Sequence, residues 1–135
     1  NNLLLGNAFY NMSYYGNARA FYYGVVMEQF GNYIDEFYQP ILVNTSQANA
    51  YYKKAFAAAT TPEQKAKCMY MMAKCERNEF YSGRHPRSKD LKEGEEVNFL
   101  AWDGFKKLKS EYSNTQYYKE VIKECGYFRK YLGME

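Results

Sequence analysis

The chain has 135 residues, enough for one domain with a buried core that needs no disulfide or metal ion to hold it together. Its 18 basic and 15 acidic residues give a formal net charge of +3, too small to indicate a nucleic-acid or acidic-membrane partner. Its apolar runs are far shorter than the roughly 20 residues of a membrane-spanning helix, so we do not expect a spanning segment. The sequence opens on Asn1, and we expect it to be a mature form or a fragment of a longer chain.

The first segment, "LLLGNAFYNMSYYGNARAFYY", is rich in aromatic and small residues. Here and along the chain, apolar residues recur at spacings of three and four without the period-2 alternation of strands, which predicts helices. We expect a helical hairpin over residues 1–30, with a turn between Asn11 and Gly16. Gly6 and Ala18 are expected to be small so that the two antiparallel helices can approach.

A second helical hairpin is predicted over residues 46–81, after an irregular stretch at residues 31–45. Its first helix places small and aromatic residues along one face: Ala48, Tyr52, Ala55 and Ala59. Its second helix begins with a capping box, in which Thr61 is the N-cap, Pro62 the first helical residue and Gln64 the partner.

Gly83 and a polar stretch over residues 82–97 are expected to end this hairpin and to form a second insertion. A third hairpin is predicted over residues 98–132. Its first helix carries an apolar stripe of Phe99, Trp102, Phe105 and Leu108. Its second helix is capped from Ser113 or Thr115, two alternatives that the sequence leaves open. The buried stripe of that helix is Tyr118, Val121, Ile122, Cys125, Phe128 and Leu132.

The three cysteines do not form a disulfide framework. Cys68 and Cys75 lie seven residues apart in one predicted helix, a rise of about 10 Å that exceeds disulfide reach. The sequence does not decide whether Cys125 forms a disulfide, nor whether the chain resides in an oxidising or a reducing compartment. The C-x2-C spacing of structural zinc sites is absent, so we expect packed thiols and no metal, with one reactive thiol as the alternative. The single histidine, His85, has no nucleophile or carboxylate at a recognisable spacing, and we expect no catalytic site and no cofactor.

A repeat pattern accounts for the first segment. Leu5 and Gly6 are followed by Phe9, and then by Ala18 and Tyr22, at spacings that resemble the tetratricopeptide repeat. The resemblance implies an all-α fold in which antiparallel helix pairs stack into a right-handed superhelix, as one domain over residues 1–135 with the two irregular stretches as insertions. The last hairpin is similar to tetratricopeptide-like units of bacterial envelope assembly lipoproteins. This similarity implies a bacterial envelope or periplasmic setting, with the cytoplasm as the alternative.

Tyrosine is the unusual component of the composition, with 16 residues, several of them in adjacent pairs. Neighbouring positions on a helix point about 100° apart, so one member of each pair is expected to be exposed. Exposed tyrosine suits a protein interface, because it offers a large contact area at low entropic cost. The candidate interface residues are Tyr10, Tyr14, Asn17 and Tyr23. Helix amphipathicity accounts for the mixed basic and aromatic runs, so we expect a protein or peptide partner and no nucleic acid.

The chain is therefore expected to be a non-catalytic protein-interaction or scaffold module, with its oligomeric state open. The alternative is a small-ligand-binding or accessory domain of an enzyme or envelope assembly, with an aromatic cleft near Trp102 and residues 82–97 as a lid. Titratable residues lining a cavity would favour this alternative, whereas an open groove lined by tyrosine and asparagine would favour the scaffold. A third hypothesis is a segment that packs against other parts of its parent protein, which an exposed apolar end at residues 1–10 would indicate.

Overall fold

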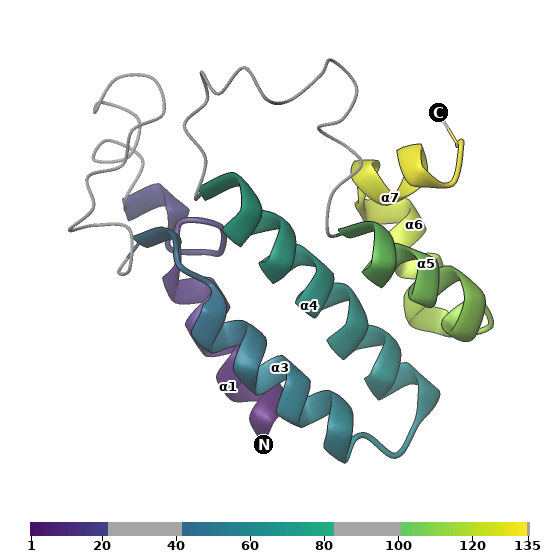
Figure 1. Cartoon of the computed structure of the whole chain (residues 1–135), viewed down its shortest axis with the longest axis horizontal. Coiled ribbons are helices and arrows are strands. Elements are labelled where there is room, and N and C mark those ends of the chain that lie inside the picture. The colour runs from purple at the N-terminus through teal and green to yellow at the C-terminus, as the bar shows by residue number, and fades with distance from the viewer. Residues whose placement is uncertain (22–41, 83–100, 135) are drawn as a thin grey trace.

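The computed structural model describes residues 1–21, 42–82 and 101–134, and every element in these ranges is a helix (Figure 1). The prediction of an all-α chain is thus confirmed. The elements are α1 (Asn2–Met12), α3 (Ser46–Ala58), α4 (Pro62–Ser82), α5 (Ala101–Tyr112), α6 (Gln116–Glu124) and α7 (Gly126–Tyr131). Most of the 31–45 stretch, all of the 82–97 stretch except Ser82, and the residues Tyr22, Tyr23, His85 and Phe99 lie outside the described residues.

Helix α4 is the central element of the described structure. It packs against α3 on one side and against α5 on the other, while α1 packs antiparallel to α3 (Figure 1). The expected hairpin over residues 46–81 is present as α3 and α4, which are joined by a short turn. Since α1 has α3 as its main neighbour among the described elements, the first helix is placed by a segment distant in sequence.

Gly6 allows α1 to approach α3 closely. A Cβ atom at Gly6 would lie 2.7 Å from the ring of Tyr52, closer than atoms of this kind tolerate. Tyr52 is fully buried, and its hydroxyl donates a hydrogen bond of 2.9 Å to the amide oxygen of Asn7. The expectation that Gly6 and Ala18 pack two helices of one hairpin together is therefore corrected for Gly6. Its close neighbour is an aromatic ring on α3.

Gly104 has the same role between α4 and α5. A Cβ atom at this position would overlap the Cβ of Ala73 on α4. The two helices therefore meet through their backbones, and larger side chains lie to either side of the contact. A small residue on each helix is what permits this approach.

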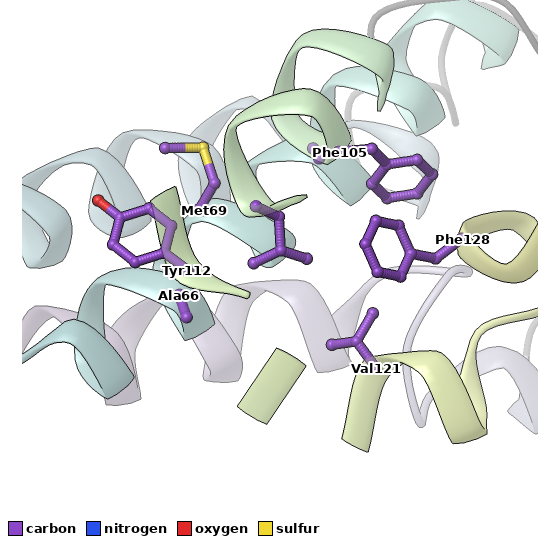
Figure 2. Close-up of a cluster of buried hydrophobic side chains, with 8 residues drawn as sticks. Ala66, Met69, Phe105, Tyr112, Val121 and Phe128 are labelled. Carbon is purple, nitrogen blue, oxygen red and sulfur yellow. The ribbon is translucent and has the colours of Figure 1, made fainter. Parts of the chain in front are cut away.

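A cluster of buried apolar residues joins α4 to the C-terminal helices (Figure 2). Its members are Ala66, Met69, Ala73, Phe105, Leu108, Tyr112, Val121 and Phe128. The rings of Phe105 on α5 and Phe128 on α7 meet edge to face, with centroids 4.9 Å apart. Figure 2 shows Val121 of α6 directed toward the Phe128 ring. The expected stripe of the last hairpin contributes Val121 and Phe128 to the core, and its other members pack half-buried against the cluster.

The predicted N-cap of α4 is confirmed, with one change in register. The hydroxyl of Thr61 accepts a hydrogen bond of 3.3 Å from the backbone N–H of Gln64. The side-chain oxygen of Gln64 accepts from the N–H of Thr60, one residue before the expected position, at 3.2 Å. Helix α4 ends at Ser82, immediately before Gly83.

Helix α6 begins at two caps. Thr115 is the N-cap, since its hydroxyl accepts a hydrogen bond of 3.1 Å from the N–H of Tyr118, which decides between the two alternatives left by the sequence. The carboxylate of Glu63, in the first turn of α4, accepts from the N–H groups of Gln116 and Tyr117 at 2.6 Å and 3.0 Å. The start of α6 is thereby tied to the start of α4.

The last predicted helix is divided in two at Cys125, which corrects the expectation of one continuous helix. Cys125 has an extended backbone, with φ −105° and ψ 101°, and α7 then begins at Gly126. The guanidinium of Arg129 donates to the carbonyl oxygens of Ile122 and Lys123 at 3.1 Å and 2.7 Å. These carbonyls at the end of α6 have no partner further along the same helix, so the arginine satisfies them and stabilises the break.

Substitution of Gly104 by alanine is expected to lower the free energy of unfolding by about 1–3 kcal/mol, because the new methyl group overlaps Ala73. The double variant Gly104→Ala/Ala73→Gly should lose less than the sum of the two single variants, since the methyl group at position 73 is then gone. Urea unfolding followed by circular dichroism measures all three.

Gly126→Ala is the matched control for this prediction. The nearest atom to its new Cβ would be a nitrogen of Arg129 at 3.8 Å, and the variant is expected within about 1 kcal/mol of wild type. Additive losses in the double variant would contradict the proposed backbone contact.

Candidate functional site

The candidate site is a cavity of about 310 Å³ between α4, α5 and the junction of α6 with α7. It is lined by Tyr70, Ala73, Lys74, Arg77, Phe105, Glu124, Cys125, Gly126 and Tyr127. This set combines aromatic rings with two cations, one carboxylate and one thiol. The elements that form the cavity are the same ones that the Phe105–Phe128 contact holds together.

Helix geometry brings the α4 residues of the cavity to one face. Tyr70, Lys74 and Arg77 follow each other at spacings of four and three, which places them on neighbouring turns of the same side. The opposite wall comes from the break between α6 and α7, where Cys125 and Tyr127 flank the first residue of the short helix. The cavity therefore depends on a continuous helix on one side and an interrupted helix on the other.

The two cations of the cavity lie over tyrosine rings. The ammonium nitrogen of Lys74 is 4.9 Å from the ring centroid of Tyr10 and 5.6 Å from that of Tyr70. The guanidinium carbon of Arg77 is 4.3 Å from the ring centroid of Tyr127. Such contacts stabilise a cation through the negative face of the ring. Burial, and then the nearby charge of Arg77, lower the pKa of Lys74 from its usual value.

Tyr70 on α4 and Cys125 at the helix break both line the cavity. Burial raises the pKa of the Tyr70 phenol above its usual value, and the neighbouring Cys125 adds to the effect. The phenol is therefore neutral at physiological pH. The cavity presents positively charged donors on α4 and one exposed carboxylate, Glu124, on the side of α6.

Tyr10 is not a surface residue, which corrects the expectation that it belongs to an exposed interface. It is only 4% exposed and packs with Ala48, Tyr52 and Cys75. Its hydroxyl accepts a hydrogen bond of 3.1 Å from the side-chain amide of Asn78. The cause is helical spacing, because Tyr10 lies four residues after the buried Gly6 and shares its inward face.

The other candidate interface residues are found in the turn after α1 or fall outside the described ranges. Tyr14 is half-buried, edge to face with Tyr15 and with the guanidinium of Arg19 at 5.1 Å from its ring centroid. Asn17 is exposed. Tyr23 lies outside the described residues. The structure thus does not bring Tyr10 together with Asn17 on one surface.

The adjacent tyrosine pairs do not expose one ring each, as the sequence had led us to expect. In the pairs at 14–15, 51–52 and 117–118, every member is buried or half-buried. Aromatic neighbours cover the second ring: Tyr51 stacks on Phe9 at 5.4 Å, and Tyr117 meets Tyr70 edge to face at 6.0 Å. The expectation was therefore wrong for these three pairs.

Phe105 and Cys125 of the lining were expected from the sequence in apolar stripes, whereas its charged residues were not singled out. The spacing of Tyr70, Lys74 and Arg77 on a predicted helix was a usable signal, because it puts an aromatic ring and two cations on one side. Tyr127 gave no such signal, since its place at the cavity depends on the helix break at Cys125.

All three cysteines are free thiols. Cys68 and Cys75 are buried, which confirms packing for both, whereas Cys125 is half-buried and lines the cavity. Burial raises the pKa of Cys68, and it raises the pKa of Cys75 to about 12. Neither buried thiol is ionised at physiological pH.

Within the described ranges of the chain, no three histidine, cysteine, aspartate or glutamate side chains are grouped so that they could hold a metal ion. No helix within the same ranges is both long and apolar enough to cross a bilayer.

Comparison of the chain with protein-family models, with curated proteins and with solved structures found no match.

Treatment of the native protein with a maleimide reagent is expected to modify Cys125 first, because this thiol alone lines the cavity. Cys68 and Cys75 should react at least about a hundredfold more slowly, since their modification requires local or global opening. Peptide mass spectrometry at several time points measures the three rates. Equal rates in the native protein would contradict the burial of the two α4 thiols.

The free energy of unfolding is expected to fall as the pH rises from about 10 toward 12. Burial raises the pKa of Tyr10 to about 12, so between these values the folded state holds a proton that the unfolded state has lost. The loss should not exceed about 1.4 kcal/mol per pH unit for this one group. Urea unfolding at a series of pH values tests the slope.

Tyr10→Phe is the matched variant, and its stability should decline less steeply over this range because the phenol is gone. Lys74 has the opposite effect on stability, at lower pH. Because its pKa is lowered in the folded state, the unfolded state binds the proton more tightly at pH values just below the usual lysine pKa of 10.5. The free energy of unfolding therefore rises with pH in that range. An unchanged slope in Tyr10→Phe would contradict the burial of this phenol.

Proposed function

We propose that the chain is a non-catalytic protein-interaction module whose helix pairs stack in the manner of a tetratricopeptide array. Support comes from the succession α1, α3, α4 and α5, in which each helix packs on the next. The contact of Gly104 with Ala73 also agrees with that pattern, which reserves small residues for positions where helices approach closely. A right-handed superhelix is part of this proposal.

The observation that carries the proposal is the cavity beside α4. Arginine and tyrosine are the residue types most often found at the energetic centres of interfaces, and the pair formed by Arg77 and Tyr127 lies at its wall. Tyr127 is 52% exposed, so a partner can reach this ring without unfolding the chain. The proposed interface therefore lies on the side of α4 and not on the first hairpin, where the sequence suggested it.

A second candidate function is the binding of a small ligand. Titratable side chains line the cavity, among them Lys74, Arg77, Glu124 and Cys125, which is the feature expected of that alternative. Its volume of about 310 Å³ is at the lower end for small-molecule sites. This size suits a single side chain or a small metabolite better than a large cofactor.

The hypothesis of a packing role in a larger protein is supported by α1. Leu4 is 61% exposed and Leu5 is 43% exposed, on a helix that contains no charged residue. Apolar side chains exposed together in this way are typical of a surface that another polypeptide covers. This role is compatible with an interaction site beside α4, because the two surfaces use different residues.

The experiment is a pull-down with the immobilised chain, using envelope and cytosolic fractions of bacterial cells. Wild type is compared with Arg77→Ala/Tyr127→Ala and with Lys67→Ala as the matched control. Lys67 also lies over a tyrosine ring, that of Tyr117, but is not part of the cavity. We expect one protein to be retained by wild type and by Lys67→Ala, and retention to fall about thirtyfold in the double variant.

Circular dichroism of each variant shows whether it is folded, so that a lost partner can be attributed to the surface. Retention that is equal in all three proteins would overturn the assignment of the interface to the cavity. Retention by none of them would favour the small-ligand or packing role.

A further inference from the structure

We propose that the cavity is an anion-binding site, in which a carboxylate of the partner lies between the ammonium of Lys74 and the guanidinium of Arg77. This inference rests on the proposed function and adds the chemical class of the group that is recognised. The two cations of the site, Lys74 and Arg77, lie on one face of α4.

The present neighbours of the two cations are mainly aromatic rings. Lys74 has the rings of Tyr10 and Tyr70, and Arg77 has the ring of Tyr127 and, at 3.5 Å, the amide oxygen of its neighbour Asn78. Aromatic faces attract a cation but do not accept its N–H bonds as a carboxylate does. An ammonium has three donors and a guanidinium five, so donors are left for a bound oxygen anion.

The charges of the two cations favour a bound anion. Lys74 and Arg77 are separated by three residues on α4 and are both half-buried, so two like charges are held in a partly desolvated place. The lowered pKa of Lys74 reflects its burial and the proximity of Arg77. An anion between the two side chains would neutralise this field and form charge-assisted hydrogen bonds with both.

The charge and the aromatic walls of the cavity favour a carboxylate over other anions. Glu124 contributes one negative charge to the cavity lining, so the net charge of the lining favours a group with a single negative charge over a dianion. Tyr70, Phe105 and Tyr127 provide apolar walls for the carbon atoms that carry the charged group. A glutamate or aspartate side chain has a single negative charge and carbon atoms that can contact these walls. Inorganic phosphate is only partly a single-charged ion at neutral pH, and it has no carbon atoms.

The test is a titration followed by NMR, reading the ring signals of Tyr127 and the side-chain signals of Lys74. Three probes are used: a short peptide with one internal glutamate and blocked ends, the same peptide with glutamine, and inorganic phosphate. We expect saturable shifts with the glutamate peptide and binding at least about tenfold weaker with its glutamine twin. Phosphate should bind more weakly than the glutamate peptide.

Four variants make the test specific to the site. Lys74→Met and Arg77→Gln should each weaken the glutamate peptide about tenfold, while Lys67→Met on the same helix should leave it unchanged. Glu124→Gln should strengthen binding severalfold, because it removes a carboxylate that lines the cavity. A variant that only disturbed folding would not strengthen binding.

Equal binding of the two peptides, or no saturable shift with either, would overturn the proposal. Phosphate binding tighter than that of the glutamate peptide would overturn the carboxylate assignment in favour of a free small anion. The two experiments can fail separately. A retained partner that depends on Arg77 and Tyr127, without selective glutamate binding, would support the interaction module and contradict the anion site. Selective glutamate binding without any retained partner would support the anion site and contradict the interaction module.

Discussion

The contact between Gly104 and Ala73 sets the distance between α4 and α5, and the rest of the C-terminal half follows from it. Phe105, the residue after Gly104 on α5, contacts Phe128 of α7, with ring centroids 4.9 Å apart. That ring pair positions α7, and α7 in turn positions the wall of the cavity that faces α4. Packing and the candidate site are therefore set by the same helix contact.

Helix α4 uses its surface in three ways. One side packs against α3, a second packs against α5, and a third carries Tyr70, Lys74 and Arg77. Tyr10, which we expected at an exposed interface, is used in packing, and together with Tyr52 it fills the space between α1, α3 and α4. Burial of a phenol requires a hydrogen-bond partner, and Asn7 and Asn78 provide it for these two rings.

The sequence predicted those features that depend on nearby residues. The helix over 62–82 was recognised because its cap and its end are encoded within a few residues, at Thr61 and Gly83. The burial of Tyr10 was missed because spacing places it on the Gly6 face of α1, but the residues that cover this face, Tyr52 and Cys75, are distant in sequence. The break at Cys125 was also missed: a cysteine and a glycine in an apolar stripe do not show that Arg129 satisfies the end of α6. Half of the candidate site, on α4, was readable from spacing, and the half formed by the break was not.

The carboxylate of Glu63 has a consequence beyond holding two helices together. The first N–H groups of a helix ordinarily face water and exchange their protons freely, because no earlier turn supplies an acceptor. At the start of α6, two of these groups bond instead to a side chain 53 and 54 residues earlier in the chain. Fraying of the first turn of α4 therefore removes the acceptor from α6, and fraying of the first turn of α6 leaves the Glu63 carboxylate without these two donors. The opening turns of α4 and α6 behave as one cooperative unit, although each alone is where a helix is weakest.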